Sequence, residues 1–461
     1  MLYTIVKKKC LPVLIGAFSI CQASAQQKDT LISLKDAISL GDQNYHLLNA
    51  GKYDIAAADK NVDVVKYSRL PTIDASYQAG ISTANNLTGV FYPTGILPIS
   101  GPPTTENTFD PATGSAAGIL LNWQAVTFGE RNARINTAVS EAGVRKALLQ
   151  KERFQHSINI ISSYLDILLA YANLNIHRHN IERVEANLRQ SRVLANSGIK
   201  AGVDTELFRS ELSKAKVEYI NTHKQLEILQ WKLARLIVVD NLPVPKDSTF
   251  LLKLPASMGL ADNDPATHPF MQYAQSQYVL SQSKEQQIKR SYLPKINIWG
   301  AGFARGSGFQ ADGSVNTWDG LNLSRYNYSL GLQLTFPLMK YGESKRQLQE
   351  QALLSRAAAE HLEDVRSDLF AQQQIVNTTW EHSLQVVTET GAQLKSAQTA
   401  FNAMQIRYNT GLVNFSDLIQ AQYILLKSEL DVKQAYWDTW KASLLEAAVK
   451  GDINIFLNEA K

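Results

Sequence analysis

The chain has 461 residues, 45% of them hydrophobic, and a formal net charge of +4. This length is sufficient for two or three ordinary domains with a sizeable core. A net charge so close to zero argues against a nucleic-acid-binding protein, which gathers basic residues on one face, and no nucleic-acid partner is predicted.

The first 25 residues have the composition of a secretory signal peptide. Three lysines at positions 7–9 precede an apolar run that ends at Ile20, and small residues lead to a predicted cleavage site after Ala25. A lipoprotein signal is the alternative, because Cys21 follows the apolar run, but Ile20 stands where that signal requires a small residue. We therefore favour a cleaved signal peptide without a lipid anchor.

Cleavage would remove both cysteines of the chain and leave a net charge of about +1. The exported protein would have no disulfide, so its stability would depend on packing or assembly. No run of 18 apolar residues follows the signal, so a transmembrane helix is not predicted. If this chain crosses a membrane, it must do so with β-strands.

The same order of elements occurs twice along the exported chain. Leu70-Pro71 recurs as Leu293-Pro294 at an offset of 223, and Phe128-Gly129-Glu130 matches Tyr341-Gly342-Glu343 at an offset of 213. Gly198 matches Gly411 at that second offset. Residues 26–250 and 251–461 are therefore predicted to be two structural repeats, each with a helix, a strand, a loop, a strand, a long helix and a return helix.

Alternating apolar and polar residues predict two strands in each repeat, separated by loops at residues 83–116 and 304–325. In the second strand of each repeat, one face is apolar. The residues on that face include Ile119, Leu121, Trp123, Leu330, Leu332, Leu334 and Phe336. The opposite face is polar and includes Asn122, Gln124, Ser329, Gln333 and Thr335. In the third strand, Gly300 and Gly302 interrupt the apolar face.

Proline-free stretches predict two very long helices at residues 130–196 and 343–409. Each would extend roughly 100 Å at 1.5 Å per residue, and apolar residues spaced by three and four indicate coiled-coil packing. Shorter return helices are predicted after Asp204 and Asp417. Residues 240–269 hold five of the fourteen prolines and are predicted to be a linker that wraps the outside of the helical part.

Four strands with one apolar face each cannot close into a membrane barrel, because barrels need about eight strands or more. Open edges in lipid would leave backbone groups unpaired, so other copies of the chain must complete the barrel. Two copies give eight strands and three give twelve, and the strand pattern permits both. A soluble sheet covered by helices is less favoured, because the same face is apolar in both repeats.

Taken together, these motifs resemble the TolC-like outer-membrane efflux proteins of Gram-negative bacteria. The resemblance covers essentially the whole exported chain and rests on the duplication, on residues 33–38 followed by Asn44, on the Leu-Pro strand entries, on the aromatic-Gly-Glu strand exits and on two Gly-x5-Asp turns. It implies a mixed α and β membrane protein. Three copies would form a twelve-stranded β-barrel in the outer membrane, continued by a long α-helical barrel across the periplasm.

The resemblance also implies a function and partners. The homotrimer would be the exit duct of a tripartite efflux pump, passively conducting small molecules, with a periplasmic adaptor protein and an inner-membrane transporter as partners. The exit duct of a type I protein secretion system is the first alternative. A structural or adhesive coiled-coil protein without a pore is the second.

By the same resemblance, the turns between long and return helices form the periplasmic entrance. Gly198, Gly202 and Gly411 would lie at the tips that contact the adaptor, and Tyr408 would help to hold a gate shut. Asp204 and Asp417 would line the entrance and favour cations, although both are also good helix-start residues in any protein.

Two positions near the second turn depart from the best-known members of the family. Val413 stands where some members have an arginine that links neighbouring helices, and Gln420 replaces an aspartate. The closed state is therefore not expected to be held in the same way.

No catalytic, cofactor-binding or metal-binding residues are predicted, and the chain is not expected to be an enzyme. His177 and His179 would point about 200° apart on a helix, so they cannot bind one metal ion together. Gly306-Ser307-Gly308 lies in a predicted loop with no helix after it, so it does not have the context of a phosphate-binding loop.

Overall fold

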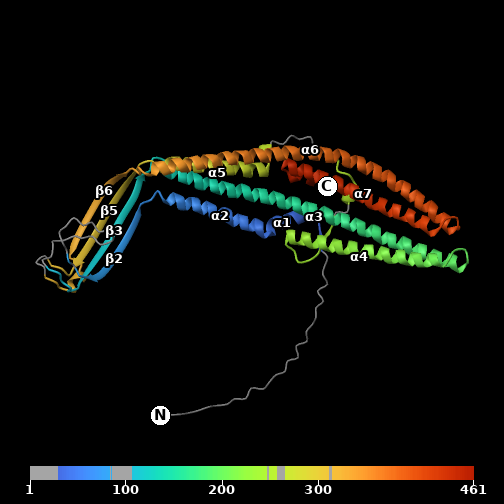
Figure 1. Ribbon diagram of the computed structural model, residues 1–461, viewed down its shortest axis with the longest axis horizontal. Helices are drawn as coiled ribbons and strands as arrows, with labels where there is room; N and C mark the ends of the chain where they lie inside the picture. The colour runs from blue at the N-terminus through green and yellow to red at the C-terminus, as the bar shows by residue number, and fades with distance from the viewer. Residues whose placement is uncertain are drawn as a thin grey trace, which may run out of the picture.

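The computed structural model describes residues 30–83, 85, 106–246, 249–256, 265–310 and 314–460. The molecule is elongated, with a β-sheet at one end and two helix turns at the other (Figure 1). The C-terminus lies near the middle of its length. The predicted signal peptide with its cleavage site at Ala25, and most of the predicted loop at 83–116, lie outside the described residues.

Helices make up most of the described chain. They are α1 (Leu34–Asn44), α2 (His46–Tyr67), α3 (Glu130–Asn196), α4 (Val203–Ile237), α5 (Pro269–Ser291), α6 (Lys340–Asn409), α7 (Phe415–Lys450) and α8 (Ile453–Glu459). The strands are β1 (Thr30–Ile32), β2 (Thr72–Ser82), β3 (Ala112–Val126), β4 (Pro243–Pro245), β5 (Lys295–Ser307) and β6 (Arg325–Thr335). Three short 3-10 helices complete the set, η1 (Thr249–Leu251), η2 (Pro265–Thr267) and η3 (Asp319–Leu321).

The four long strands form one antiparallel sheet in the order β2-β3-β5-β6. The register aligns the apolar faces of all four strands, because residues that pair directly lie on the same face. One row across the sheet joins Ile73, Leu121, Gly300 and Leu330, and the next joins Trp123, Ile298 and Leu332. The sheet therefore has one continuous apolar face, as the alternation predicts for each strand.

The glycines that interrupt the predicted third strand are not required by packing. A Cβ at Gly300 would be in ordinary contact, 3.5 Å from Leu330 and 3.8 Å from Leu121, and one at Gly302 would meet no atom within 4 Å. On the opposite face, Gly331 of β6 lies under the indole of Trp299, where an added Cβ would be only 2.7 Å from the ring. Gly331 therefore lets the indole lie flat across the strand.

The observed strands differ from the predicted ones at their ends. β3 starts at Ala112 and β5 runs to Ser307, so both loops are shorter than predicted. β6 ends at Thr335, which places Phe336 one residue beyond the strand. Hydrogen bonds between backbone groups across the sheet extend each strand into segments whose glycine content disfavours strands.

The two predicted long helices are confirmed as α3 and α6, which end at Asn196 and Asn409 as expected. Their starts differ from each other. Gly129 precedes α3 with a φ of +93°, a left-handed conformation that favours glycine, whereas Gly342 lies inside the first turn of α6. The aromatic-Gly-Glu motif therefore turns the chain sharply at the first strand exit only.

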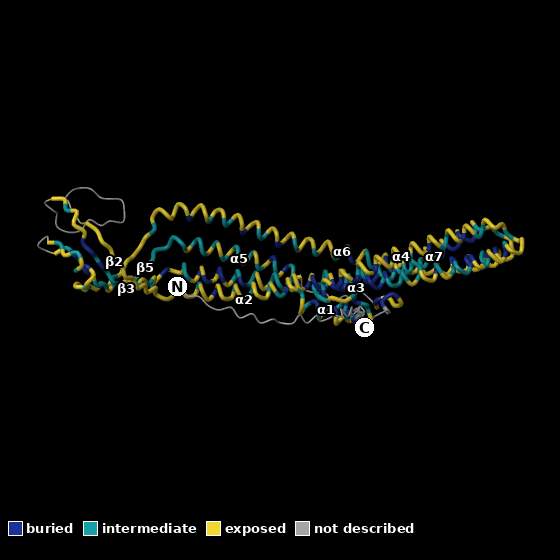
Figure 2. The backbone as a smooth tube through the Cα atoms, turned by 90° about the horizontal axis from the view of Figure 1, so that it is seen from below, coloured by how far each residue is buried: buried dark blue, intermediate teal, exposed yellow. Residues whose placement is uncertain are grey.

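The main core lies near the middle of the molecule, where buried residues gather around α1, α3 and the C-terminal helices (Figure 2). The predicted linker packs against this core from outside. Phe250 contacts the ring of Trp440 at 4.7 Å between centroids, and the indole Nε1 of Trp440 donates to the carbonyl oxygens of Phe250 and Lys253. Strands β1 and β4 pair in parallel beside it.

Two buried histidines occupy this middle region. His268 caps α5, because its Nδ1 accepts a hydrogen bond from the backbone N–H of Phe270 at 3.1 Å and its Nε2 donates to the carbonyl of Ala448 at 2.9 Å. The ring of His156 stacks on Tyr45 at 3.9 Å. Burial lowers the pKa of both histidines below the ordinary 6.5, and nearby backbone carbonyls oppose this only in part.

Acid should therefore destabilise the helical part of the protein. The unfolded chain binds protons at these histidines as the pH falls through 6.5, whereas the folded chain binds them only at lower pH. The free energy of unfolding is thus retained above that pH and decreases below it.

We expect His268→Asn, which keeps a capping acceptor but cannot be protonated, to reduce the acid-induced fall in melting temperature. Far-UV circular dichroism would measure this, with His361→Asn on the exposed surface of α6 as control. An equal fall in all three proteins would contradict the role of His268.

Candidate functional site

The two helix turns at the end opposite the sheet have matching geometry. Gly198 and Gly411 have φ values of +72° and +82°, which a residue with a side chain adopts only with strain. The next residue in each turn donates its N–H back into the last turn of the long helix, from Ile199 to the carbonyl of Leu194 and from Leu412 to that of Arg407. Each long helix therefore ends in the glycine-dependent motif that reverses chain direction.

Gly202, the third predicted tip glycine, has a different role. It is the residue before α4, with a φ of −61°, a conformation open to any residue. No atom outside its neighbours lies within 4 Å of the position that a Cβ would take. The structure therefore requires no glycine at this position, in contrast to Gly198 and Gly411.

A buried aromatic cluster holds the four helix ends together behind the turns. Phe208 of α4 is fully buried and meets the rings of Tyr408 at 5.7 Å and Phe415 at 4.7 Å, both edge to face. Leu418 and Leu425 of α7 complete the packing. Edge-to-face rings have preferred geometries, so this cluster fixes the relative position of the two helical hairpins.

Within this cluster the structure brings together two of the predicted gate residues. The hydroxyl of Tyr408 donates to Oδ2 of Asp204 at 3.1 Å. Burial raises the pKa of Tyr408 to about 12 and the Asp204 carboxylate adds to that rise, with a hydrogen bond from Ser191 opposing it. The hydroxyl therefore stays protonated at neutral pH and links α6 to the start of α4.

Asp417, the third predicted gate residue, is not part of that link. Its carboxylate accepts from the backbone N–H of Asn414, and its own N–H donates to the side chain of Asn414 at 2.9 Å. This reciprocal pair is the capping box of α7. Asp417 thus has a clear structural role at its helix start, and it remains partly exposed.

Lys200 was not among the predicted site residues, yet it bridges the two turns. Its Nζ donates to the carbonyl oxygen of Val413 at 2.7 Å and lies 5.2 Å from the centre of the Tyr408 ring. Lys200 and Val413 are related by the same offset of 213 that relates the two turns. Comparing both turns at this offset would have revealed a basic residue in the first turn where the second has valine.

A buried polar network continues from the turns along the helices. The side-chain amide of Gln422 donates to Asn180 and accepts from Asn187, each at 3.0 Å, and Gln405 donates to Asn187 at 3.3 Å. All three of Asn180, Asn187 and Gln422 are buried. Hydrogen bonds between α3, α6 and α7 therefore replace apolar packing over this length.

At the other end of the molecule, the predicted lipid-facing residues lie on the exposed apolar face of the sheet. Leu330, Leu332 and Ile119 are 78%, 76% and 57% exposed. Leu334 and the neighbouring Phe336 are also exposed, while Leu121 and Trp123 are half-buried. Contiguous exposed apolar residues of this size mark a surface that contacts lipid or another protein.

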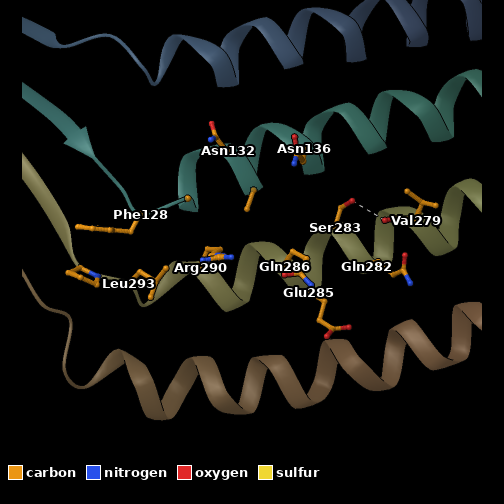
Figure 3. Close-up of a pocket in the computed structure, with 13 residues that line it drawn as sticks. Phe128, Asn132, Asn136, Val279, Gln282, Ser283, Glu285, Gln286, Arg290 and Leu293 are labelled. Atoms are coloured by element: carbon orange, nitrogen blue, oxygen red, sulfur yellow. Dashed lines mark hydrogen bonds between the residues drawn. The ribbon is translucent and has the colours of Figure 1, made fainter.

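An open groove of about 1290 Å³ lies where the helices meet the sheet. It lies between the start of α3 and the end of α5 (Figure 3). Its lining mixes apolar residues such as Phe128 with the amide side chains of Asn132, Asn136 and Gln286 and the charged Arg290. Its lining includes Ser283 and Glu285 but no histidine, so it has no imidazole base to activate the serine hydroxyl.

No group of three or more His, Cys, Asp or Glu side chains among the described residues could hold a metal ion. Within the part of the chain that is described, no helix has both the length and the hydropathy needed to span a membrane.

Comparisons with solved structures identify the fold. The match to the solved structure of CusC covers 97% of this chain and 99% of that one, with a TM-score of 0.74 at 14% identity. It matches the Campylobacter jejuni CmeC outer membrane channel over 91% of this chain and 85% of that one, with a TM-score of 0.72 at 14% identity. This mixed helical and sheet fold is that of the TolC-like outer-membrane channels.

Sequence comparison identifies the family. The family model described as outer membrane efflux protein matches residues 37–237 and 267–439. The chain is also 20% identical over 452 residues to outer membrane protein TolC of Escherichia coli strain K12, covering 94% of this chain and 84% of TolC. The chain belongs to the outer membrane efflux protein family.

Family membership establishes the general class and location. The protein is an outer-membrane efflux channel of a Gram-negative cell, with part of its length in the periplasm. The matching family is described by efflux, which supports a transport role rather than an enzymatic one. The predicted resemblance is therefore confirmed.

Removing the Lys200 bridge should loosen both turns without unfolding the helices. We expect Lys200→Met to lose about 1 kcal/mol of local stability, the typical net contribution of one hydrogen bond. Amide hydrogen exchange in residues 197–202 and 410–414 should then increase roughly fivefold. Lys216→Met is the control, because Lys216 is more than half exposed and its ion pair with Glu185 spans 4.0 Å. Unchanged exchange in both turns would show that Lys200 does not hold them together.

Proposed function

We propose that this protein is the exit duct of a tripartite efflux pump and acts as a homotrimer. The observation that carries the proposal is the single sheet with one continuous, exposed apolar face and two open edges. Strands β2 and β6 are the outer strands of that sheet, and neither has a second partner among the described residues. Three copies, joined edge to edge, would close a twelve-stranded barrel with its apolar face toward lipid.

The helical part would continue the same pore. At 67 and 70 residues, α3 and α6 each extend roughly 100 Å. Exposed apolar side chains such as Leu353, Phe370 and Ile375 follow α6 along its length, where neighbouring copies would pack. With α3, α6 and the shorter helices beside them, three copies would form a closed α-helical barrel.

We also propose that residues 26–250 and 251–461 are structural repeats within each chain. The order strand, strand, long helix, return helix occurs as β2-β3-α3-α4 and again as β5-β6-α6-α7. The helices before the strands support this as well. The residue before α2 is Tyr45 and that before α5 is His268, which are 223 positions apart, the offset of the Leu-Pro motifs.

Conduction would be passive, and the helix turns would form its gate. Asp204 and Asp417 would surround the entrance, and Tyr408 and Lys200 would hold the two hairpins of each copy together. Ile199 and Leu412, at the tips of the two turns, are 59% and 72% exposed and offer an apolar contact for a periplasmic adaptor protein. Adaptor binding would favour an open arrangement of the turns, with the transporter in the inner membrane supplying the energy.

The proposed barrel predicts opposite effects for two neighbouring residues of β6. Leu332→Arg places a charge on the lipid-facing side, which costs about 2–4 kcal/mol at the middle of a membrane, so we expect little assembled protein in outer membranes. Gln333→Arg places the same charge on the water-facing side and should assemble normally. The measurement is the yield of detergent-stable trimers and their conductance in planar bilayers. Equal yields for both variants would refute the barrel. A wild-type protein that is monomeric and shows no conductance would refute it as well.

Charge at the turns should determine ion preference. Asp204→Asn and Asp417→Asn remove one negative charge each but keep oxygen acceptors for Tyr408 and for the α7 cap. We expect the double variant to reduce the cation-to-anion permeability ratio at least about twofold, because focused carboxylate charge attracts cations. Reversal potentials in a salt gradient measure this ratio, with Asp63→Asn on the exposed side of α2 as control. A ratio and conductance equal to wild type would place the entrance elsewhere.

A further inference from the structure

Two arginines lie directly opposite each other at the end of the sheet farthest from the helices. Arg305 of β5 pairs with Arg325 of β6 in the antiparallel register. The same row continues through Ala116 and Gln78, so it carries two positive charges and no negative one. Figure 1 shows the sheet at the opposite end of the molecule from the helix turns.

Both arginines lie on the polar face of the sheet. They alternate with Ala304 and Tyr326, which belong to the apolar face. Further along the strands, that polar face carries Ser329 and Gln333. Arg305 and Arg325 are both exposed, and the guanidinium of Arg305 lies 5.3 Å from the centre of the Phe303 ring on the same face.

Neither Arg305 nor Arg325 forms an ion pair with an acidic side chain among the described residues. The four long strands contain one acidic residue, Asp74, on this same face. It lies in the row of Ser329, which is two same-face rows nearer the helices than the arginine row. Four residues of strand separate these rows, roughly 13 Å along the strand. Like charges directly opposite each other destabilise a sheet, so this pair has an unfavourable interaction that an anion would relieve.

We propose that Arg305 and Arg325 form an anion-binding site on the water-facing wall of the outer mouth. This inference rests on the proposed function, because the trimer would place three such pairs around one opening. The ligand class is an anion with two or more oxygens, such as a phosphate or carboxylate group. Guanidinium groups bind these oxygens in a bidentate manner, and contact with Phe303 restricts the orientation of Arg305.

The site gives the channel opposite charges at its two ends. The helix turns carry Asp204 and Asp417, whereas the outer mouth carries the arginine pairs. Rings of arginine or lysine favour anions in pores, as rings of carboxylates favour cations. Anionic groups of solutes would therefore be retained briefly at the exit, and anions from outside would bind there first.

Block of the channel by inorganic pyrophosphate tests the proposal. Single-channel currents of the full-length trimer are recorded in planar bilayers while pyrophosphate is added to one side at a time. We expect block from one side only, weaker at higher salt because screening shortens the range of the charges. In Arg305→Gln/Arg325→Gln the apparent affinity should fall about tenfold or more, since charge-assisted hydrogen bonds are lost.

Two variants make the result specific. Arg305→Lys/Arg325→Lys keeps the charge but not the bidentate geometry, so block should be weakened less than in the glutamine variant. Lys52→Gln/Lys60→Gln removes the same charge from exposed positions on α2 and should leave block unchanged. If the double glutamine variant does not assemble, the single variants Arg305→Gln and Arg325→Gln replace it.

Each outcome has a distinct meaning. One-sided block that is lost with the arginines supports the site. Normal conductance with equal block in the wild type and the glutamine variants overturns this inference alone. A wild-type protein that forms no channel overturns the proposed function and this inference with it.

Discussion

The rest of the structure depends on one constraint. The four-stranded sheet cannot pair the backbone groups at its own edges or bury its own apolar face. Its outer strands β2 and β6 each have one unpaired edge among the described residues. The short η3 packs on β3 and β5 at the loop end of the sheet's apolar face, and Ile119, Leu330 and Leu332 of that face are exposed. In the proposed barrel, lipid would cover the apolar face and strands of neighbouring copies would pair with these edges. The exposed apolar face and the open edges therefore agree with the outer-membrane location.

The helical part follows a different rule, because in the proposed channel it would have to hold together and also move. Near the middle, apolar residues such as Tyr164, Leu165 and Trp440 form a dry core. Between this core and the turns lies the buried amide network of Asn180, Asn187 and Gln422. At the turns, apolar packing returns in the cluster around Phe208, and the Tyr408–Asp204 hydrogen bond lies beside it. Hydrogen bonds can exchange partners with water as helices shift, whereas interdigitated apolar packing resists such shifts. The amide network is therefore the part of this helical bundle best suited to adjustment.

Periodic signals in the sequence predicted the fold well. The alternation of β6 and the proline-free stretches of α3 and α6 are local patterns that repeat over many residues, so the faces and helix ends could be read directly. Contacts between distant residues could not be read in this way. Lys200 and Val413 meet only because two hairpins come together, and the pairing of Arg305 with Arg325 depends on the register of β5 against β6. Strand ends were also mispredicted, because pairing with a neighbour extends β3 and β5 into residues of low strand propensity.

The linker around residues 240–269 gives the molecule a mechanical property. With α8 and the β1–β4 pair, it fastens α3 and α7 at mid-length, as the contacts of Phe250 and Trp440 show. From Leu168 in this fastened region to the end of α3 is about 40 Å of helix. If a helix held at that point tilts by about 5° as a rigid body, its end about 40 Å away moves by about 3.5 Å. A motion too small to disturb the core would thus be large enough to change the width of an opening at the turns.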